Sequence, residues 1–292
     1  MRTYPECLIC FERQARDASR LAGLESSKID IILREVTELL TRVDPRLLPP
    51  EIARSVYGLI DKHSGINDVY KELKKKSNKL AMSLYDELIR KIDMAEDKIL
   101  MGIRMAVAGN VIDYGLPHVF DVKKELDECV GKDFAVFDYE DFRRVYEPSK
   151  KILYILDNAG EIVFDKMLIS LMNKHVTAAV RERPIINDVT IEDAKEIGLE
   201  RISRVISSGS GMPGTILAQS SEEFKKCYRE SDMVISKGQG NYETFSGNES
   251  AAIKSDIKPV FFLFKAKCPV VARHAGCELG DIVLKYEDKK LR

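Results

Sequence analysis

The chain of 292 residues has no long apolar run, no excess of either charge and few cysteines. Its apolar runs, such as Val260 to Phe264, fall far below the roughly 20 residues of a membrane-spanning helix. The 46 Lys and Arg residues balance 47 Asp and Glu residues, which argues against a general nucleic-acid binder. Six cysteines do not resemble a secreted disulfide framework. No charged and then apolar leader opens the sequence. We therefore expect a cytoplasmic protein with no membrane or nucleic-acid partner; its oligomeric state stays open.

The sequence pattern changes near residue 130, which predicts a mainly helical domain over 1–130 and an α/β domain over 131–292. The clearest helical pattern runs from Leu80 to Ala106, where apolar residues recur at steps of three and four. We expect one helix there that stops near Gly109 and Asn110. Shorter helical segments precede it, separated by "DPRLLPPE" and "KHSGIND", whose Pro, Gly and Asn residues interrupt helices.

From about residue 150, short runs rich in Ile and Val alternate with helical segments. The runs are "KILYIL", "VTAAV", "RISRVI", "DMVIS", "VFFLF" and "DIVLKY". The expected helices lie near 161–174, 190–197, 222–230 and 241–253. This alternation predicts a Rossmann-like, three-layer α/β/α fold with a largely parallel sheet. In such sheets ligands bind beyond the carboxyl ends of the strands.

Polar clusters follow the predicted strands or end the long helix. They are Asp157 with Asn158, Asn187 with Asp188, "SSGSGMPGT" (207–215), Lys237 in "KGQGN", and Asn110 with Asp113. If the strands are parallel, the first four clusters gather at one edge of the sheet. Carboxylate and amide oxygens suit a hard divalent cation, whereas a lysine and glycine N–H groups suit an anion. Together these groups predict phosphoryl chemistry.

Each cluster also has a purely structural interpretation. Asp157 could form only a turn, and the glycine-rich loop could be only a turn. Asp188 could cap a helix, although Thr190 with Asp193 already provides a cap there. Glu161 could favour the helix dipole or support the site from behind. Asn110 could be only a helix C-cap.

The motif "DNAGE" does not fit two other enzyme classes, the haloacid-dehalogenase phosphatases and the methyltransferases. Haloacid-dehalogenase phosphatases carry a second aspartate two residues after the first, and here that residue is Ala159. A methyltransferase would usually carry a glycine-rich turn after its first strand, whereas "DNAGE" supplies only Gly160.

As a set, "LDNAGEIVFDKMLI", "RPIINDVT", "GMPGT", "SKGQGNYET" and "AGNVIDYG" resemble the damage-control phosphatase family, a metal-dependent group first catalogued as domain of unknown function 89. The resemblance covers nearly the whole chain. It implies a three-layer α/β domain joined to a helical domain, and a metal held by Asp157, Asn158 and Asp188. It also implies that Lys237 contacts phosphate and that Asn110 and Asp113 line the same cleft. The N-terminal "CLIC" matches the prokaryotic subfamily.

The resulting prediction is a phosphatase that depends on Mn, Ni, Co or Mg and hydrolyses phosphate monoesters of small metabolites, either sugar phosphates or damaged phosphometabolites. Asp157 would orient the attacking water or attack directly, and we favour water. Lys237 and the N–H groups from Gly209 to Gly214 would hold phosphate oxygens. The alternatives are an S-adenosylmethionine-dependent carboxyl methyltransferase and a non-catalytic sugar-phosphate sensor.

Cys7 and Cys10 form a C-x-x-C pair at the start of a predicted helix. We favour simple packing against the core. A second metal site is the next interpretation, and it would need further ligands, such as Cys268 and Cys277, brought close by the fold. A redox pair is the third.

Overall fold

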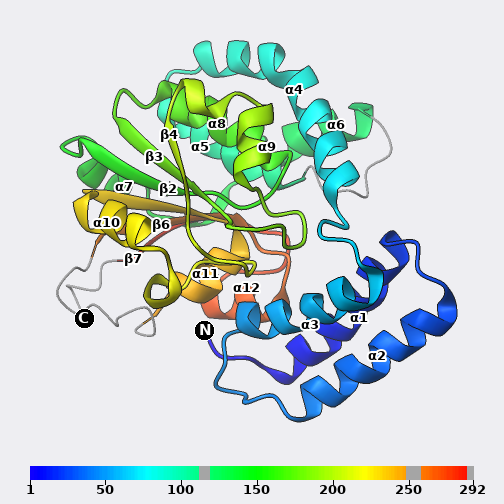
Figure 1. Cartoon of the computed structure of the whole chain (residues 1–292). Helices are drawn as coiled ribbons and strands as arrows, with labels where there is room; N and C mark the ends of the chain where they lie inside the picture. Colours follow the sequence, from blue (N-terminus) through cyan, green and yellow to red (C-terminus); the bar gives the residue numbers. More distant parts are fainter. Residues whose placement is uncertain (112–118, 248–257, 288–292) are drawn as a thin grey trace.

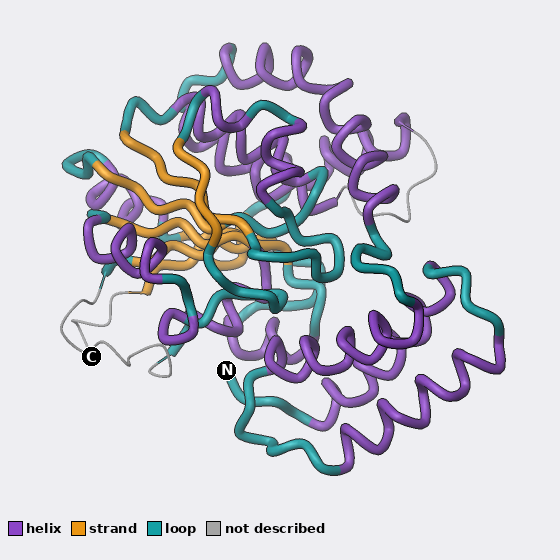
Figure 2. Tube along the Cα trace, viewed as in Figure 1, coloured by secondary structure: helices purple, strands orange, loops and turns teal. Residues whose placement is uncertain are grey.

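A seven-stranded sheet lies between two helical layers and orders its strands β1-β7-β6-β5-β2-β3-β4 (Figures 1 and 2). The structure is a computed structural model and describes residues 1–111, 119–247 and 258–287. The strands are β1 (Phe134–Phe137), β2 (Lys151–Ile155), β3 (His175–Val180), β4 (Arg204–Ser207), β5 (Met233–Lys237), β6 (Val260–Lys265) and β7 (Ile282–Glu287). Strands β2 to β6 are parallel, and β7 pairs antiparallel with β6. The predicted three-layer, largely parallel fold is confirmed.

Helices cover both faces of the sheet and account for most of the first 130 residues. They are α1 (Pro5–Leu21), α2 (Ser26–Thr41), α3 (Pro49–Ser64), α4 (Lys71–Asp93), α5 (Lys98–Ala108), α6 (Val119–Gly131), α7 (Tyr139–Tyr146), α8 (Glu161–Leu171), α9 (Ile191–Glu196), α10 (Glu222–Glu230), α11 (Gly238–Phe245) and α12 (Pro269–Ala275). One apolar core joins α4, α5, α8 and α9 to the sheet. The other joins the opposite face to α10, α11, α12 and the α1–α3 group (Figure 1).

The prediction of a single helix from Leu80 to Ala106 is wrong, because one helix ends at Asp93 and the next begins at Lys98. Asp97 caps the second helix: its carboxylate accepts a hydrogen bond of 2.9 Å from the backbone N–H of Leu100. The apolar stripe continues across the break because α4 and α5 both pack against α8. The predicted boundary at residue 130 stays a prediction.

Two further differences concern short elements. Strand β1 was not predicted, because its four residues "FAVF" alternate only between half-buried and exposed positions and form no continuous apolar run. Helix α11 ends at Phe245, whereas the expected segment reached 253. Residues 248–253 of that expected helix lie outside the described residues.

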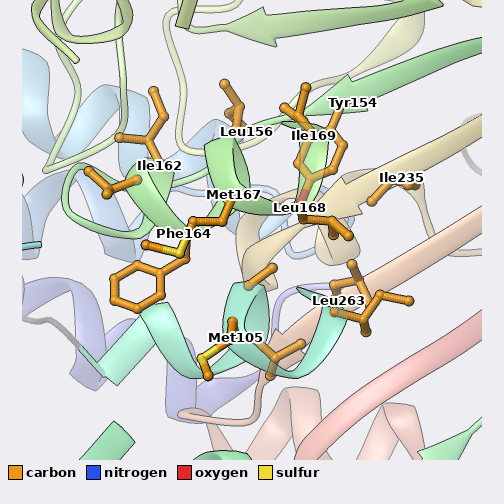
Figure 3. Close-up of a cluster of buried hydrophobic side chains, with 14 of the residues drawn as sticks. Met105, Tyr154, Leu156, Ile162, Phe164, Met167, Leu168, Ile169, Ile235 and Leu263 are labelled. Carbon is orange, nitrogen blue, oxygen red and sulfur yellow. The ribbon is translucent and has the colours of Figure 1, made fainter. Parts of the chain in front are cut away.

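The packing of α5 on α8 brings the end of α5 to the candidate site. Met105, Phe164 and Leu168 belong to the cluster between these helices and the sheet (Figure 3). Gly109 permits this approach, since a Cβ there would lie 2.7 Å from the Phe164 ring. Asn110, the next residue, therefore reaches the start of α8. Among the described residues, no helix combines the length and apolarity that crossing a bilayer requires.

Candidate functional site

The backbone beyond β2 and β3 joins the two predicted metal-binding motifs. The N–H of Val189 donates to the carbonyl of Asp157, and the N–H of Ala159 donates to the carbonyl of Asn187, both at 2.9 Å. Asn158 and Asp188 form an isolated antiparallel bridge. The expected parallel arrangement of the strands predicted this juxtaposition, and the structure places Asp157, Asn158 and Asp188 together.

These three side chains lie at one end of a cleft of about 590 Å³. Helices α1 and α3 and the starts of α11 and α12 also contribute residues to its lining. Besides Asp157, Asn158 and Asp188, the lining includes Asn110, Asn187, Pro213, Gln239, Gly240, Glu243, Lys267 and Cys268, with Cys7, Cys10, Arg13 and Pro50 from the helical unit. The cleft can therefore hold a small molecule against the two carboxylates.

The carboxamide of Asn158 is oriented by two carboxylates. Its Nδ2 donates to Asp157 Oδ2 at 2.7 Å and to Glu161 Oε2 at 3.3 Å. Because the NH₂ group faces these acceptors, the carbonyl oxygen of the same carboxamide remains for a ligand. Asn110 supports the arrangement from α5, since its Nδ2 donates to Glu161 Oε2 at 2.5 Å.

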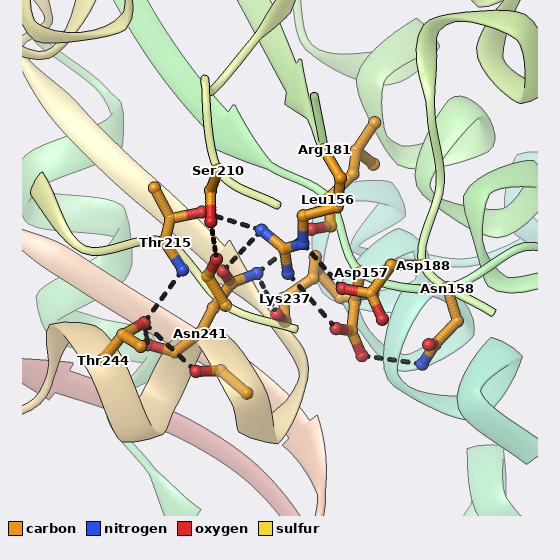
Figure 4. Close-up of polar contacts among 12 residues, drawn as sticks. Leu156, Asp157, Asn158, Arg181, Asp188, Ser210, Thr215, Lys237, Asn241 and Thr244 are labelled. Carbon is orange, nitrogen blue, oxygen red and sulfur yellow. Dashed lines mark hydrogen bonds and ion pairs between the residues drawn. The ribbon is translucent and has the colours of Figure 1, made fainter. Parts of the chain in front are cut away.

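Arg181, which follows β3, points toward the carboxylates of Asp157 and Asp188 (Figure 4) and is only 1% exposed. Its Nε donates to Asp188 Oδ2 at 2.6 Å. Its Nη2 atom lies 3.8 Å from Asp157 Oδ1. Its Nη1 donates to Thr215 Oγ1 and to Asn241 Oδ1 at 2.7 and 3.0 Å. No role is predicted for Arg181 from the sequence, although a charged residue directly after the apolar run "VTAAV" is a usable signal.

Lys237 is not among the described residues that line the cleft, and its side chain is fully buried beside Glu161 and Asp165. Its Nζ donates to the Ala106 carbonyl at 2.9 Å, to Glu161 Oε1 at 2.5 Å and to Asp165 Oδ1 at 2.7 Å. An ammonium group has three hydrogens, so all its donors already have acceptors. This geometry gives no support to the predicted phosphate contact, which stays untested; it indicates that Lys237 orients Glu161.

Negative charge exceeds positive charge in this buried network. Four carboxylates, those of Asp157, Glu161, Asp165 and Asp188, face the two cations Arg181 and Lys237. Burial is the main cause that raises the pKa of Asp157 far above its ordinary value, and repulsion from Asp188 and Glu161 adds to it. Burial likewise raises the pKa of Asp188, and it raises that of Asp165 to about 6. A further positive charge would relieve this repulsion.

The glycines of "KGQGN" serve contacts within the protein. Gly238 has φ +75°, and a Cβ there would lie 1.9 Å from Asp157 Oδ2. A Cβ at Gly240 would lie 2.1 Å from the carbonyl oxygen of Pro213. These positions therefore let α11 begin directly against Asp157 and against the glycine-rich loop.

In the predicted phosphate cradle, the N–H groups of both named glycines already have acceptors within the protein. Gly209 N–H donates to Ser207 Oγ at 3.0 Å, and Gly214 N–H donates to the Met212 carbonyl at 2.8 Å. Neither glycine is among the described residues that line the cleft. Their predicted contact with substrate stays untested. Asp113, the remaining predicted substrate-binding residue, lies outside the described residues.

The C-x-x-C pair opens onto the same cleft. Cys7 is buried and Cys10 is half-buried, and Cys268 from the start of α12 also lines the cleft. All three thiols are free, and burial raises the pKa of Cys7. Within the described residues, no group of three or more His, Cys, Asp or Glu side chains is arranged to hold a metal. Asp157 and Asp188 are only two such side chains, so the predicted metal set with Asn158 as third donor stays a prediction.

The fold and site define a class: an α/β protein with a carboxylate-rich cleft beyond the ends of its parallel strands. The model of the damage-control phosphatase ARMT1-like domain matches residues 3–283. The chain belongs to this family. It is 33% identical to damage-control phosphatase PH1575 of Pyrococcus horikoshii over the full length of both chains.

Two further similarities agree with this assignment. The uncharacterized protein MJ0202 of Methanocaldococcus jannaschii is 34% identical, and the match covers 96% of this chain and 94% of the relative. The crystal structure of a DUF89 family protein from Pyrococcus horikoshii superimposes with a TM-score of 0.87 at 31% identity, covering 97% of this chain and 98% of that one.

Proposed function

We propose that this chain is a divalent-metal-dependent phosphatase that hydrolyses phosphate monoesters of small metabolites. The observation that carries the proposal is the charge deficit beneath the cleft, where four buried carboxylates face two buried cations. With all four carboxylates ionised, the network carries two excess negative charges, which a single divalent cation would balance. The names of relatives support the reaction, since the Pyrococcus horikoshii and Archaeoglobus fulgidus proteins are both named damage-control phosphatases.

The available donors fit a hard cation such as Mn²⁺ or Mg²⁺. Asp157 and Asp188 supply carboxylate oxygens, and the hydrogen bonds of the Asn158 NH₂ group leave its carbonyl oxygen for the cation. Such a set of three leaves room for water and phosphate oxygens. When bound, the cation would offset charge on a phosphoryl group and lower the pKa of the attacking water.

The protein residues around the cation would hold and orient the reactants. Asp157 would accept a hydrogen bond from the attacking water and direct its lone pair toward phosphorus. Lys237 would affect the reaction without contacting the substrate. It holds Glu161, whose carboxylate orients the Asn158 amide. Arg13 and Lys267 line the cleft and offer positive charge to an anionic substrate.

The test is phosphate release from p-nitrophenyl phosphate and from a panel of sugar phosphates, with Mn²⁺, Mg²⁺, Ni²⁺ or Co²⁺ and after chelation. We expect turnover that chelation abolishes and added metal restores. Binding of S-adenosylmethionine without phosphate release would instead favour the methyltransferase. Saturable binding of a sugar phosphate with no turnover under any metal would favour a sensor.

A further inference from the structure

Arg181 remains unexplained by the proposed reaction, although its surroundings are unusually elaborate. A guanidinium group has five N–H donors. Three of them bond to Asp188, Thr215 and Asn241. Nη2 is buried and makes no hydrogen bond within the described residues. Leaving two charged donors unsatisfied in the interior is costly, so this placement needs a reason.

The partners of Arg181 come from four of the five predicted motifs. Asp188 follows β3, and Asp157 follows β2. Thr215 ends the glycine-rich loop, and Asn241 lies in α11. Asn241 is itself held, because its Nδ2 donates to the carbonyls of Leu156 and Lys237 at 3.0 and 2.8 Å. One planar group therefore connects four segments that are far apart in the sequence (Figure 4).

The geometry toward the two carboxylates is specific. The Nε–H group of Arg181 donates to Oδ2 of Asp188. Oδ1 of that carboxylate makes no bond to Arg181 and can face the cleft. Nη2 lies 3.8 Å from Oδ1 of Asp157. Oδ2 of the Asp157 carboxylate accepts a hydrogen bond from Asn158 Nδ2. A small rotation of Asp157 would complete the Nη2 hydrogen bond. Each carboxylate would then keep one well-defined orientation.

We propose that Arg181 is a positioning residue that fixes the orientation in which Asp157 and Asp188 face the divalent cation. The inference rests on the proposed metal-dependent function. A forked guanidinium can contact both carboxylates and be braced by Thr215 and Asn241 at the same time. An ammonium group carries the same charge but cannot span these four partners. Hydrogen-bonding partners behind metal ligands commonly change metal affinity by about 10- to 100-fold when replaced.

The experiment compares Arg181→Lys with Arg183→Lys, an identical exchange at an exposed arginine two residues further on. Mn²⁺ binding is measured by calorimetry on the full chain, and thermal unfolding reports whether each variant folds. Charge is unchanged in both variants, so a difference in affinity reports the geometry of the fork. We expect Arg181→Lys to bind Mn²⁺ about 10- to 100-fold more weakly and Arg183→Lys to match the wild type.

A second pair keeps the test decisive if Arg181→Lys does not fold. Thr215→Val removes the oxygen that accepts from Nη1, whereas Thr215→Ser keeps it. We expect weaker Mn²⁺ binding for the Val variant alone. Wild-type affinity in Arg181→Lys, or in Thr215→Val where the first variant is unfolded, overturns the assignment. If the wild type itself binds no divalent cation, the proposed function fails first, and this inference fails with it.

Discussion

Gly238 has no room for a side chain, and the reason lies in the candidate metal site. Its φ of +75° disfavours other residues, and a Cβ would overlap Asp157 Oδ2. We expect Gly238→Ala to displace Asp157 and to weaken Mn²⁺ binding by at least about tenfold. Gly276→Ala is the matched control, because its φ is +82° but a Cβ there would meet nothing within 4 Å. Equal loss of metal affinity in both variants would show that backbone strain, and not contact with Asp157, is responsible.

Substitution of Lys237 distinguishes two roles for the "KGQGN" motif, a buried ion pair and a contact with phosphate. The described hydrogen bonds make Lys237 the buried partner of Glu161 and Asp165. Lys237→Met would leave two carboxylates without their cation, which we expect to cost about 3–5 kcal/mol of unfolding free energy. Denaturant unfolding measures this, with the exposed Lys226→Met as control. A stable Lys237→Met protein with a raised KM would instead support direct contact with phosphate.

Glu243, which lines the cleft, should make the stability of the protein depend on pH. Burial raises the pKa of its carboxyl to about 7, above the ordinary value near 4.3. The folded protein therefore takes up this proton first as the pH falls, so stability rises between about pH 8 and 5. Glu243→Gln has no such proton, so its unfolding temperature should rise less than that of the wild type over this range. Parallel curves for the two proteins would contradict the assignment.

At the scale of elements, the carboxyl ends of β2 and β3 were the most predictable part of the site. Their apolar runs and the following "DN" and "ND" dipeptides placed Asp157, Asn158 and Asp188 at one sheet edge. The break between α4 and α5 was not predictable from periodicity, because both halves face the same apolar surface. The burial of Lys237 was also missed, since it depends on carboxylates from α8 that a strand-end pattern does not orient.

Helix α1 lines the cleft and brings Cys7 and Cys10 into it. The proposed chemistry needs neither a thiolate nor a soft metal. We expect the double variant Cys7→Ser with Cys10→Ser to keep phosphate release within about tenfold of wild type, with its fold checked by circular dichroism. A loss of about a hundredfold or more, comparable to that of a general acid, would show that the thiols take part.

At the scale of the whole molecule, sequence order predicted the sheet and the edge that carries the site. The same order could not show how α5, α8 and α11 bury a charged network behind that edge, because the network depends on side-chain contacts between distant segments. Asn110 reaches Glu161 only because Gly109 lets α5 pack closely on Phe164. Arg181 likewise acquires its partners only when four segments meet.

The proposed function depends on the binding of one divalent cation by Asp157, Asn158 and Asp188. The decisive measurement is calorimetric titration of Mn²⁺ into the wild type and Asp188→Asn, with Asp133→Asn, at an exposed position, as control. We predict one Mn²⁺ per wild-type chain, unchanged binding in the control and an affinity lower by on the order of tenfold or more in Asp188→Asn. Mn²⁺ binding by Asp188→Asn with the affinity of the wild type would contradict it.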